Sequence, residues 1–446
     1  MFENVLGQPV SAQLIHDIEA GVLAPAMLFS GSSSSGKGTA ALELGRVISC
    51  ENPVSSGSTI APWDCGCTAC SFHRLLTHPD MLCFGPRSFY AEIAASSQAM
   101  EKDIAGKLFF IRSVRKLLLR FNPVLWEDDP KASRISPLVN SLEEDINEIE
   151  QIKSMPDEND SAFLKLIKGI TANAYKLEAE GISKDIPIGQ IRRASWWSRL
   201  SPSGKGKIII IENADRMQNE ARNSLLKILE EPPDSLSLVL TTQRHGSIIP
   251  TILSRLRVYR FNKREVNAED DVIRRVFRDS NAEKGIGINR YLDSFLPVSG
   301  AALENLAAFF TASVAYKAVM LAKKKNLSVC EETIILGRYT APIAEKAGYG
   351  RPVPERDDLV GSIMDKAGKF EIRTIFTMFL YSVLDQVSNG LRQGDSSFLP
   401  RPEYREIWKK RISWAENAAV IYNLMPQAVL EKLFLDLSLD LSLAEA

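Results

Sequence analysis

The chain has 446 residues, which is more than one ordinary domain holds and predicts two or three domains. Hydrophobic residues make up 45% of it and charged residues 24%, a composition typical of folded soluble proteins. The net charge of −1 excludes a global basic field, so any contact with nucleic acid would need local patches. We see no apolar run near the roughly 18 residues of a membrane span and no secretory signal. We therefore expect a cytoplasmic protein without membrane contacts.

The first motif is the segment LFSGSSSSGKGTAALELG. The run AMLFSG suits a buried parallel strand, and apolar residues recur at helical spacing from residue 37 onward. Strand, glycine-rich loop and helix form the context of a phosphate-binding loop, in which backbone N–H groups cradle phosphates and a lysine reaches them. Gly31, Gly36 and Lys37 match this pattern. A plain glycine- and serine-rich surface loop is the alternative.

The loop departs from the pattern directly after its lysine. A Ser or Thr is required there because its hydroxyl holds Mg²⁺, but this sequence has Gly38. Thr39 comes one residue late, which on a helix turns its side chain by about 100°. Thr39 is therefore a poor replacement, although we keep it with Gly31, Gly36 and Lys37 as a candidate nucleotide-binding residue.

Four of the six cysteines cluster after this helix. They are Cys50, Cys65, Cys67 and Cys70. In a cytosolic chain such clustering favours metal over disulfides, and four thiolates suffice for a closed, structural zinc site. The pair Cys65 and Cys67 is one residue tighter than the usual spacing, so His73 and His78 remain alternative ligands. Buried free cysteines are the alternative to a metal site.

The pattern turns helical between about residues 101 and 180. The segments LEEDINEIEQIKSM and AFLKLIKGITANAYKL each place apolar residues on one helical face, and the polar segment PDEND separates them. This pattern predicts an antiparallel helical hairpin inserted into the α/β domain.

The α/β pattern returns with KIIIIENAD, where the β-branched run Ile208–Ile211 predicts a central strand. A P-loop ATPase needs an acid at the end of such a strand to hold Mg²⁺, and a group that positions water. Glu212 could reach a metal, but Asn213 is a neutral amide that cannot accept a proton. Loss of a general base alone costs on the order of 10²–10⁴ in rate. We therefore expect no turnover, although nucleotide binding could survive.

Arg255 follows Ser254 in the segment TILSRLRVYRF. An arginine that reaches a neighbour's γ-phosphate stabilises the charge of the transition state, whereas an ordinary surface arginine is the alternative. After residue 261 the chain has a helical pattern throughout, with GYGRPVPERDD (348–358) as the best linker.

Taken in order, these motifs resemble the AAA+ subunits of the bacterial replicative clamp loader, part of the DNA polymerase III holoenzyme. The segment FENVLGQP resembles the family's opening, the cysteine knuckle follows the P-loop helix, and NSLLKILEEPP follows the second strand motif. TILSR corresponds to the family's serine–arginine finger motif. The segment THPDM, Gly38 and ENAD resemble the delta-prime type of subunit rather than the gamma/tau motor. The resemblance covers about residues 1–100 and 186–261 well, and the rest weakly.

The resemblance implies an α/β P-loop (AAA+) domain at 1–261, with a zinc knuckle at 50–70 and a helical insertion at about 101–180. It further implies an all-α lid domain at 262–347 and an all-α collar domain for oligomerisation at 359–446. The family forms a ring that uses ATP to open the sliding clamp and place it on primed DNA. This chain would be a non-catalytic member, with weak or vestigial ATP binding and with Arg255 as a trans-acting arginine finger. Its partners would be gamma/tau-type motor subunits and a delta-type subunit.

Two other functions stay open at the level of sequence. One is an active gamma/tau-type motor that tolerates the shifted Thr39 and uses Glu212 for metal. The other is a nucleic-acid-binding module built from the zinc knuckle and a basic stripe. The stripe consists of Arg112, Arg115, Lys116 and Arg120.

Overall fold

The computed structural model of the chain describes most of its residues. These are residues 1–52, 61–102, 104–127, 129–154, 160–183, 185–296, 298, 300–353, 355, 359–361, 363–364, 372–392, 400–420 and 424–443. The chain divides into two compact units, Met1–Phe295 and Leu296–Ala446. The predicted domain boundaries at residues 261 and 347 do not coincide with this division and stay a prediction. Parts of the predicted knuckle, turn and linker lie outside the described residues.

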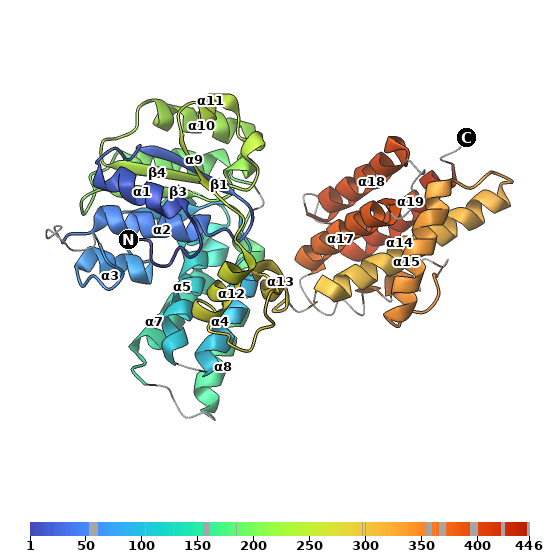
Figure 1. Cartoon of the computed structure of the whole chain (residues 1–446), viewed down its shortest axis with the longest axis horizontal. Coiled ribbons are helices and arrows are strands. Elements are labelled where there is room, and N and C mark those ends of the chain that lie inside the picture. Colours follow the sequence, from blue (N-terminus) through green and yellow to red (C-terminus); the bar gives the residue numbers. More distant parts are fainter. Residues whose placement is uncertain are drawn as a thin grey trace. The chain divides into compact units, whose positions relative to one another are not determined.

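A five-stranded sheet forms the centre of the first unit (Figure 1). Its strands are β1 (Ala26–Gly31), β2 (Met81–Phe84), β3 (Lys207–Ile211), β4 (Leu236–Thr242) and β5 (Arg257–Phe261). They run in the order β2-β3-β4-β1-β5, and every neighbouring pair is parallel. The prediction of an α/β fold with a parallel sheet is confirmed.

The strands β1, β2, β3 and β4 are buried on both faces, which explains their nearly continuous apolar runs, whereas the edge strand β5 exposes Arg257 and Arg260. On one face Phe29 and Ile210 pack against α1 (Val10–Glu19) and α2 (Lys37–Ser49). On the other face Leu28 and Ile211 pack against the helices that follow the insertion. Figure 1 shows α2 below the strands and α9, α10 and α11 above them.

The remaining helices of this unit fall along the chain as follows. They are α3 (Thr68–Leu75), α4 (Tyr90–Lys102), α5 (Lys107–Leu118), α6 (Pro123–Trp126), α7 (Ala132–Gln151), α8 (Ser161–Gly181), α9 (Ile188–Ser198), α10 (Asn219–Glu230), α11 (Pro250–Leu253), α12 (Val266–Arg275) and α13 (Ile288–Asp293). Short 3₁₀ turns lie at Ile104–Gly106 (η1), Leu119–Phe121 (η2), Ala214–Arg216 (η3) and His245–Ser247 (η4).

The helical insertion has a core of its own. The two predicted helices are confirmed as α7 and α8, with Ile146 and Ile170 among their fully buried side chains. They do not form a lone hairpin, because α4 and α5 pack against them around Phe110 and complete a four-helix group. Asp160 begins α8 as its N-cap and accepts hydrogen bonds from the backbone N–H groups of residues 162 and 163.

The second unit is helical, as predicted. Its helices are α14 (Gly300–Lys324), α15 (Glu331–Lys346), α17 (Ile372–Arg392), α18 (Pro402–Val420) and α19 (Pro426–Ser442). They share one core, in which Phe310, Phe379 and Phe434 make edge-to-face ring contacts.

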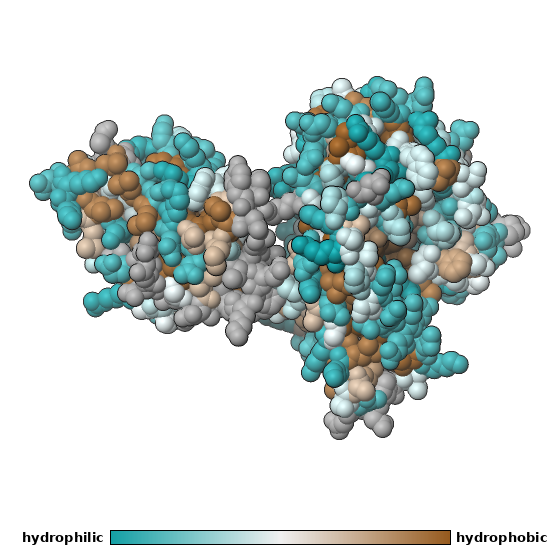
Figure 2. All heavy atoms as spheres, turned by 180° about the vertical axis from the view of Figure 1, so that it is seen from behind, coloured by the Kyte–Doolittle hydropathy of each residue, from teal (hydrophilic) through white to brown (hydrophobic). Residues whose placement is uncertain are grey.

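Helix α14 corrects one expectation from the sequence. By length and composition it is apolar enough to cross a membrane, although we saw no such run in the sequence. However, 67% of its apolar window is buried inside the structure, as expected for the core helix of a soluble protein. On the face seen in Figure 2, hydrophobic residues are scattered among hydrophilic ones.

Candidate functional site

The predicted phosphate-binding loop connects the end of β1 to the start of α2. At Gly31, a Cβ atom would collide with the backbone carbonyl of Phe261 on β5, so the two strands approach too closely for any side chain. Gly36 has φ +92°, a left-handed conformation that glycine adopts without strain. The strand, loop and helix that the sequence predicted are therefore confirmed. The structure also explains why glycine is needed at both positions.

Lys37 is buried and points back into the loop. Its Nζ donates hydrogen bonds to the carbonyl oxygens of Gly31 at 2.8 Å and Ser32 at 2.5 Å. Burial lowers the pKa of Lys37 to about 8, even though the nearby Glu212 carboxylate acts in the opposite direction. Arg264 donates to the carbonyl of Ser34 and so covers the same loop. No local sequence pattern indicates this second cation.

Glu212 lies directly beside Gly38. A Cβ atom at Gly38 would be 2.5 Å from Oε1 of Glu212, so the carboxylate occupies the space where a hydroxyl-bearing side chain would begin. Thr39 is half-buried in the next position of α2. Magnesium requires near-octahedral oxygen ligands, and this pair of positions offers a carboxylate without the hydroxyl.

The Glu212 carboxylate is already paired with two arginines. Oε2 accepts a hydrogen bond from Arg120 of η2, and Oε1 lies 3.5 Å from Nη1 of Arg87, which follows β2. Burial raises the pKa of Glu212, but the charges of Arg120, Arg87 and Lys116 outweigh burial and keep that pKa below its usual value. Sequence reasoning predicted Glu212 as a residue that could reach a metal, and the structure places it in these ion pairs.

The basic stripe of α5 and η2 is directed inward. Arg120 pairs with Glu212, Lys116 with Glu92, and Arg115 with Glu150. Arg112 donates to the carbonyl of Arg74 and lies over the ring of Trp63. These side chains are buried or half-buried, so the stripe does not offer the exposed basic surface that its helical spacing suggested.

Asn213, at the end of β3, is held by hydrogen bonds to two neighbouring segments. It has φ +51°, its Nδ2 donates to the carbonyl of Pro86 at 2.6 Å, and its backbone N–H donates to Thr241 Oγ1 at 3.2 Å. Asp215, two residues on, accepts a hydrogen bond from the hydroxyl of Thr242 at 2.7 Å. The amide therefore holds the end of β3 against its neighbours.

Arg255 follows helix α11, away from any buried contact. Its Nη2 donates to Oε1 of Glu230 at 2.9 Å, and its Nη1 donates to the carbonyl of Thr251 at 2.8 Å. The side chains of Arg255 and Glu230 are 36% and 52% exposed. The guanidinium is therefore accessible to a second molecule.

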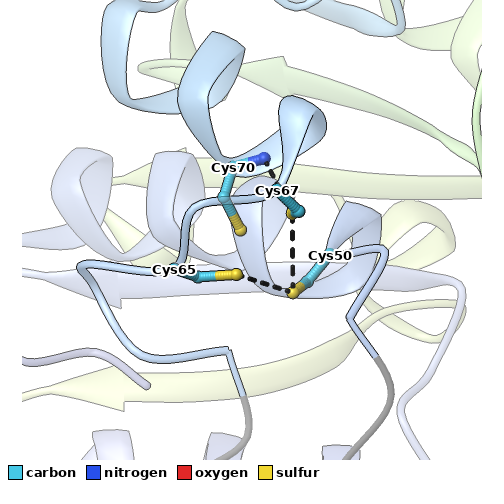
Figure 3. A group of neighbouring side chains, drawn as sticks. All are labelled: Cys50, Cys65, Cys67 and Cys70. Atoms are coloured by element: carbon cyan, nitrogen blue, oxygen red, sulfur yellow. Dashed lines mark hydrogen bonds between the residues drawn. The ribbon is translucent and has the colours of Figure 1, made fainter.

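The four clustered cysteines meet at one point (Figure 3). Their sulfur atoms all lie within 4.8 Å of one another, and within the described part of the chain this is the group that could hold a metal ion. Cys65 is a member despite its tight spacing, while His73 and His78 stack on each other outside the cluster.

Donors other than the thiol groups form hydrogen bonds to three of the sulfurs. Asn52 donates to Cys65 at 3.2 Å, Arg46 donates to Cys70 at 3.3 Å, and the backbone N–H of Cys70 donates to Cys67 at 3.4 Å. Burial raises the pKa of Cys67, but backbone donors at Glu51 and Cys70 outweigh it and bring that pKa to about 6. The cluster thus favours thiolate at Cys67.

The first unit is an α/β domain in which a glycine-rich loop joins a parallel strand to a helix, and a helical unit follows it in the chain. The family model described as "DNA polymerase III, delta subunit" matches residues 126–265. The DNA polymerase III subunit delta' of Pseudomonas aeruginosa is 33% identical over 91 residues, which are 20% of this chain and 28% of that protein. The same subunit of Bacillus subtilis is 40% identical over 75 residues, which are 17% of this chain and 23% of that protein.

Over these segments, the matches confirm the resemblance to the delta' type of DNA polymerase III subunit. The chain spans between 23% and 28% of the length of these two relatives. A solved structure, a DNA polymerase III gamma subunit-related protein from Thermotoga maritima, is 18% identical. That match covers 57% of this chain and 80% of the other, with a TM-score of 0.27.

Proposed function

We propose that this chain is a non-hydrolysing, delta'-like subunit of a replicative clamp loader, which helps to load the sliding clamp on primed DNA. Its partners would be gamma/tau-type motor subunits and a delta-type subunit. The related segment includes the strand β3, the helix α10 and the arginine motif, which are parts that such a subunit would use in the ring.

The expected absence of turnover rests on the close approach of the Glu212 carboxylate to Gly38. The carboxylate that would hold Mg²⁺ is paired with Arg120 and Arg87, and no hydroxyl stands at Gly38. Asn213 cannot act as a general base, because a neutral amide does not accept a proton, and its Nδ2 donates to the carbonyl of Pro86. The fold is retained, whereas the groups for hydrolysis are missing or occupied.

Arg255 is the group that this subunit would contribute to catalysis, in a neighbouring subunit. Its guanidinium is exposed and is held by a surface ion pair, one backbone carbonyl and a long hydrogen bond to the Ser254 hydroxyl. A cation in this setting can move to an incoming phosphate at low cost, because exposed ion pairs are worth only about 0–1 kcal/mol.

The cysteine cluster would hold a structural zinc ion. The sulfur of Cys50 lies 3.7 Å from that of Cys65 and 3.9 Å from that of Cys67. Tetrahedral zinc with Zn–S bonds of about 2.3 Å requires sulfur separations of about 3.8 Å. Bound zinc would fix the knuckle to helix α2; the four cysteines leave no ligand position open for chemistry.

The domain division follows the same proposal. Residues 1–261 would form the AAA+ domain, 262–347 the lid, and 359–446 the collar through which subunits assemble. Exposed apolar side chains on α19, at Leu435 and Leu439, are compatible with such an assembly.

ATP turnover in the assembled complex tests this function. The chain alone should be inactive, and the complex with its motor and delta-type subunits should hydrolyse ATP. Arg255→Ala should lower turnover by about 10³ or more at the site that receives this arginine. Arg260→Ala, on the exposed face of β5, is the matched control and should leave turnover unchanged. An unchanged rate in Arg255→Ala, or robust turnover by the chain alone, would overturn the proposal.

A further inference from the structure

We propose that Arg120 is a built-in cation at the position that a phosphate-binding loop reserves for magnesium, so that the α/β unit keeps one conformation whether or not Mg²⁺ and nucleotide are present. The helical segment that carries Arg120 thereby gains a function: it supplies this cation. The inference concerns the chain by itself and does not depend on clamp loading.

The first support is the way in which Arg120 is held. Its guanidinium bonds to Glu212, donates to Cys83 Sγ at 2.9 Å and to the carbonyl of Lys116 at 3.2 Å, and lies 4.9 Å from the ring centre of Phe89. Arg120 is only 4% exposed. A buried guanidinium requires a carboxylate partner. If Glu212 bound a metal ion instead, the Arg120 guanidinium would be left buried without a counter-charge.

The second support is independent of Arg120 and comes from Gly38. The absence of a side chain there is what makes room for the Glu212 carboxylate, since a Cβ atom would be 2.5 Å from Oε1. The glycine and the ion pair are therefore two parts of one arrangement. A residue with a hydroxyl at this position would displace the carboxylate from Arg120.

The third support is the charge around the same carboxylate. Arg87 bridges Glu212 and Glu92, and Lys116 pairs with Glu92, so three cations surround two carboxylates in a largely buried cluster. The cluster has a cationic excess before any metal arrives. A divalent cation would have to enter a site that is already positive, against direct charge repulsion.

This arrangement also accounts for where the insertion joins the sheet. Arg87 lies in the loop after β2, and Arg120 lies in η2, directly after α5. The polypeptide therefore enters and leaves the pair α4–α5 beside Glu212. The cluster ties that helical pair to the carboxyl end of β3.

The direct test uses the full chain and the metal itself. Thermal unfolding of the wild type should shift by less than about 1 °C when Mg²⁺ is added to ATP, because tight binding to the folded state is what raises a midpoint. In parallel, Mn²⁺ with ATP, followed by electron paramagnetic resonance, should stay free of the protein. A Mg²⁺-dependent rise in the midpoint, or bound Mn²⁺ that Glu212→Gln releases, would overturn the inference.

A double-mutant cycle tests the geometry without any ligand. Gly38→Ala should lower the unfolding midpoint in the wild type but lower it much less, or raise it, in the Glu212→Ala background, because the colliding carboxylate is gone. Gly169→Ala on α8, where a Cβ atom would contact no neighbour, is the matched control and should not lower the midpoint in either background. Equal effects of Gly38→Ala in both backgrounds would overturn the inference.

The milder variant Arg120→Lys keeps the charge while shortening the side chain, for the case in which Glu212→Ala does not fold. It should lower the midpoint and reduce the penalty of Gly38→Ala. An unchanged penalty would contradict the coupling. A failure of these tests leaves the ring assay of Arg255 unaffected, so the two proposals can fail separately.

Discussion

Arg46 on α2 donates a hydrogen bond to the sulfur of Cys70 at 3.3 Å, and both residues are essentially inaccessible to solvent. The same guanidinium forms an ion pair with Glu43 (Nη2–Oε1, 2.6 Å) and donates to the carbonyls of Ala61 and Pro62. The helix that begins at the phosphate-binding loop is thereby connected to the cysteine cluster through one buried side chain.

Arg46→Met should therefore destabilise the chain strongly. It strands the Glu43 carboxylate in the core, and breaking a buried ion pair costs about 3–5 kcal/mol. Urea unfolding of the full chain measures the loss. Arg274→Met is the control, because Arg274 pairs with Asp271 at the same three-residue spacing but is 61% exposed, and it should cost less than about 1 kcal/mol. Equal costs for the two variants would contradict the expectation.

Cys50→Ser should abolish metal binding at the cluster. Elemental analysis of the wild type should find about one zinc per chain, since four thiolates complete one tetrahedral ion. The variant should lose it together with part of its thermal stability. Cys330→Ser is the control: Cys330 is buried in the helical unit, donates to Glu332 at 2.6 Å, and lies outside the cluster. A metal-free wild type, or zinc retained in Cys50→Ser, would refute the site.

The order of the elements could be predicted from the sequence because it depends on local pattern. Apolar residues that are continuous or periodic in the sequence show directly which elements are buried. This holds for the run that ends at Gly31, for Ile208–Ile211 and for the periodic segments that form α7 and α8. The four cysteines were equally visible, because the ligands of a knuckle lie close together in sequence.

The partner of Glu212 could not be predicted in this way. Arg120 is 92 residues away in the chain, and no local pattern tells which carboxylate a distant arginine will meet. The helical spacing of the basic stripe was recognised, but helical spacing alone does not show whether a charged face is exposed. That face points inward because α3, α4 and α7 pack against α5 and supply partners for its cations. The sequence shows at Gly38 only that a hydroxyl is missing. It does not show that the Glu212 carboxylate occupies the space in which a side chain would begin.

Acid should weaken the charge cluster through Glu92. Burial raises the pKa of Glu92, but the charges of Lys116 and Arg87 outweigh burial and bring it to about 2, below the usual 4.5. Because this pKa is lowered in the folded state, its stabilisation is complete above about pH 4.5 and disappears as the pH falls towards 2. By linkage it amounts to at most about 3 kcal/mol, of which about 1 kcal/mol is lost by pH 4.

Urea unfolding of the wild type and Glu92→Gln at pH 7, 5 and 4 checks this dependence. The stability gap between the two proteins should be constant from pH 7 to 5 and narrow by pH 4. Glu150→Gln is a useful comparison, because Glu150 pairs with Arg115 while being 34% exposed. A gap for Glu92 that does not change with pH would show that this carboxylate is not held ionised by its neighbours.

The ion pair between Arg255 and Glu230 should have little effect on stability but should restrain the arginine. Both side chains are exposed enough that the pair is worth about 0–1 kcal/mol, so Arg255→Ala and Glu230→Gln should each change the free energy of unfolding by no more than this.

Releasing Arg255 by Glu230→Gln should raise ATP turnover of the complex by up to about fivefold, the equivalent of 1 kcal/mol, or leave it unchanged. Arg255→Ala should instead abolish the contribution of this subunit. Stopped-flow phosphate release in the assembled complex, with the unfolding curves of both variants beside it, separates the two effects. A large loss of turnover in Glu230→Gln would mean that Glu230 holds Arg255 in its working position and does not restrain it.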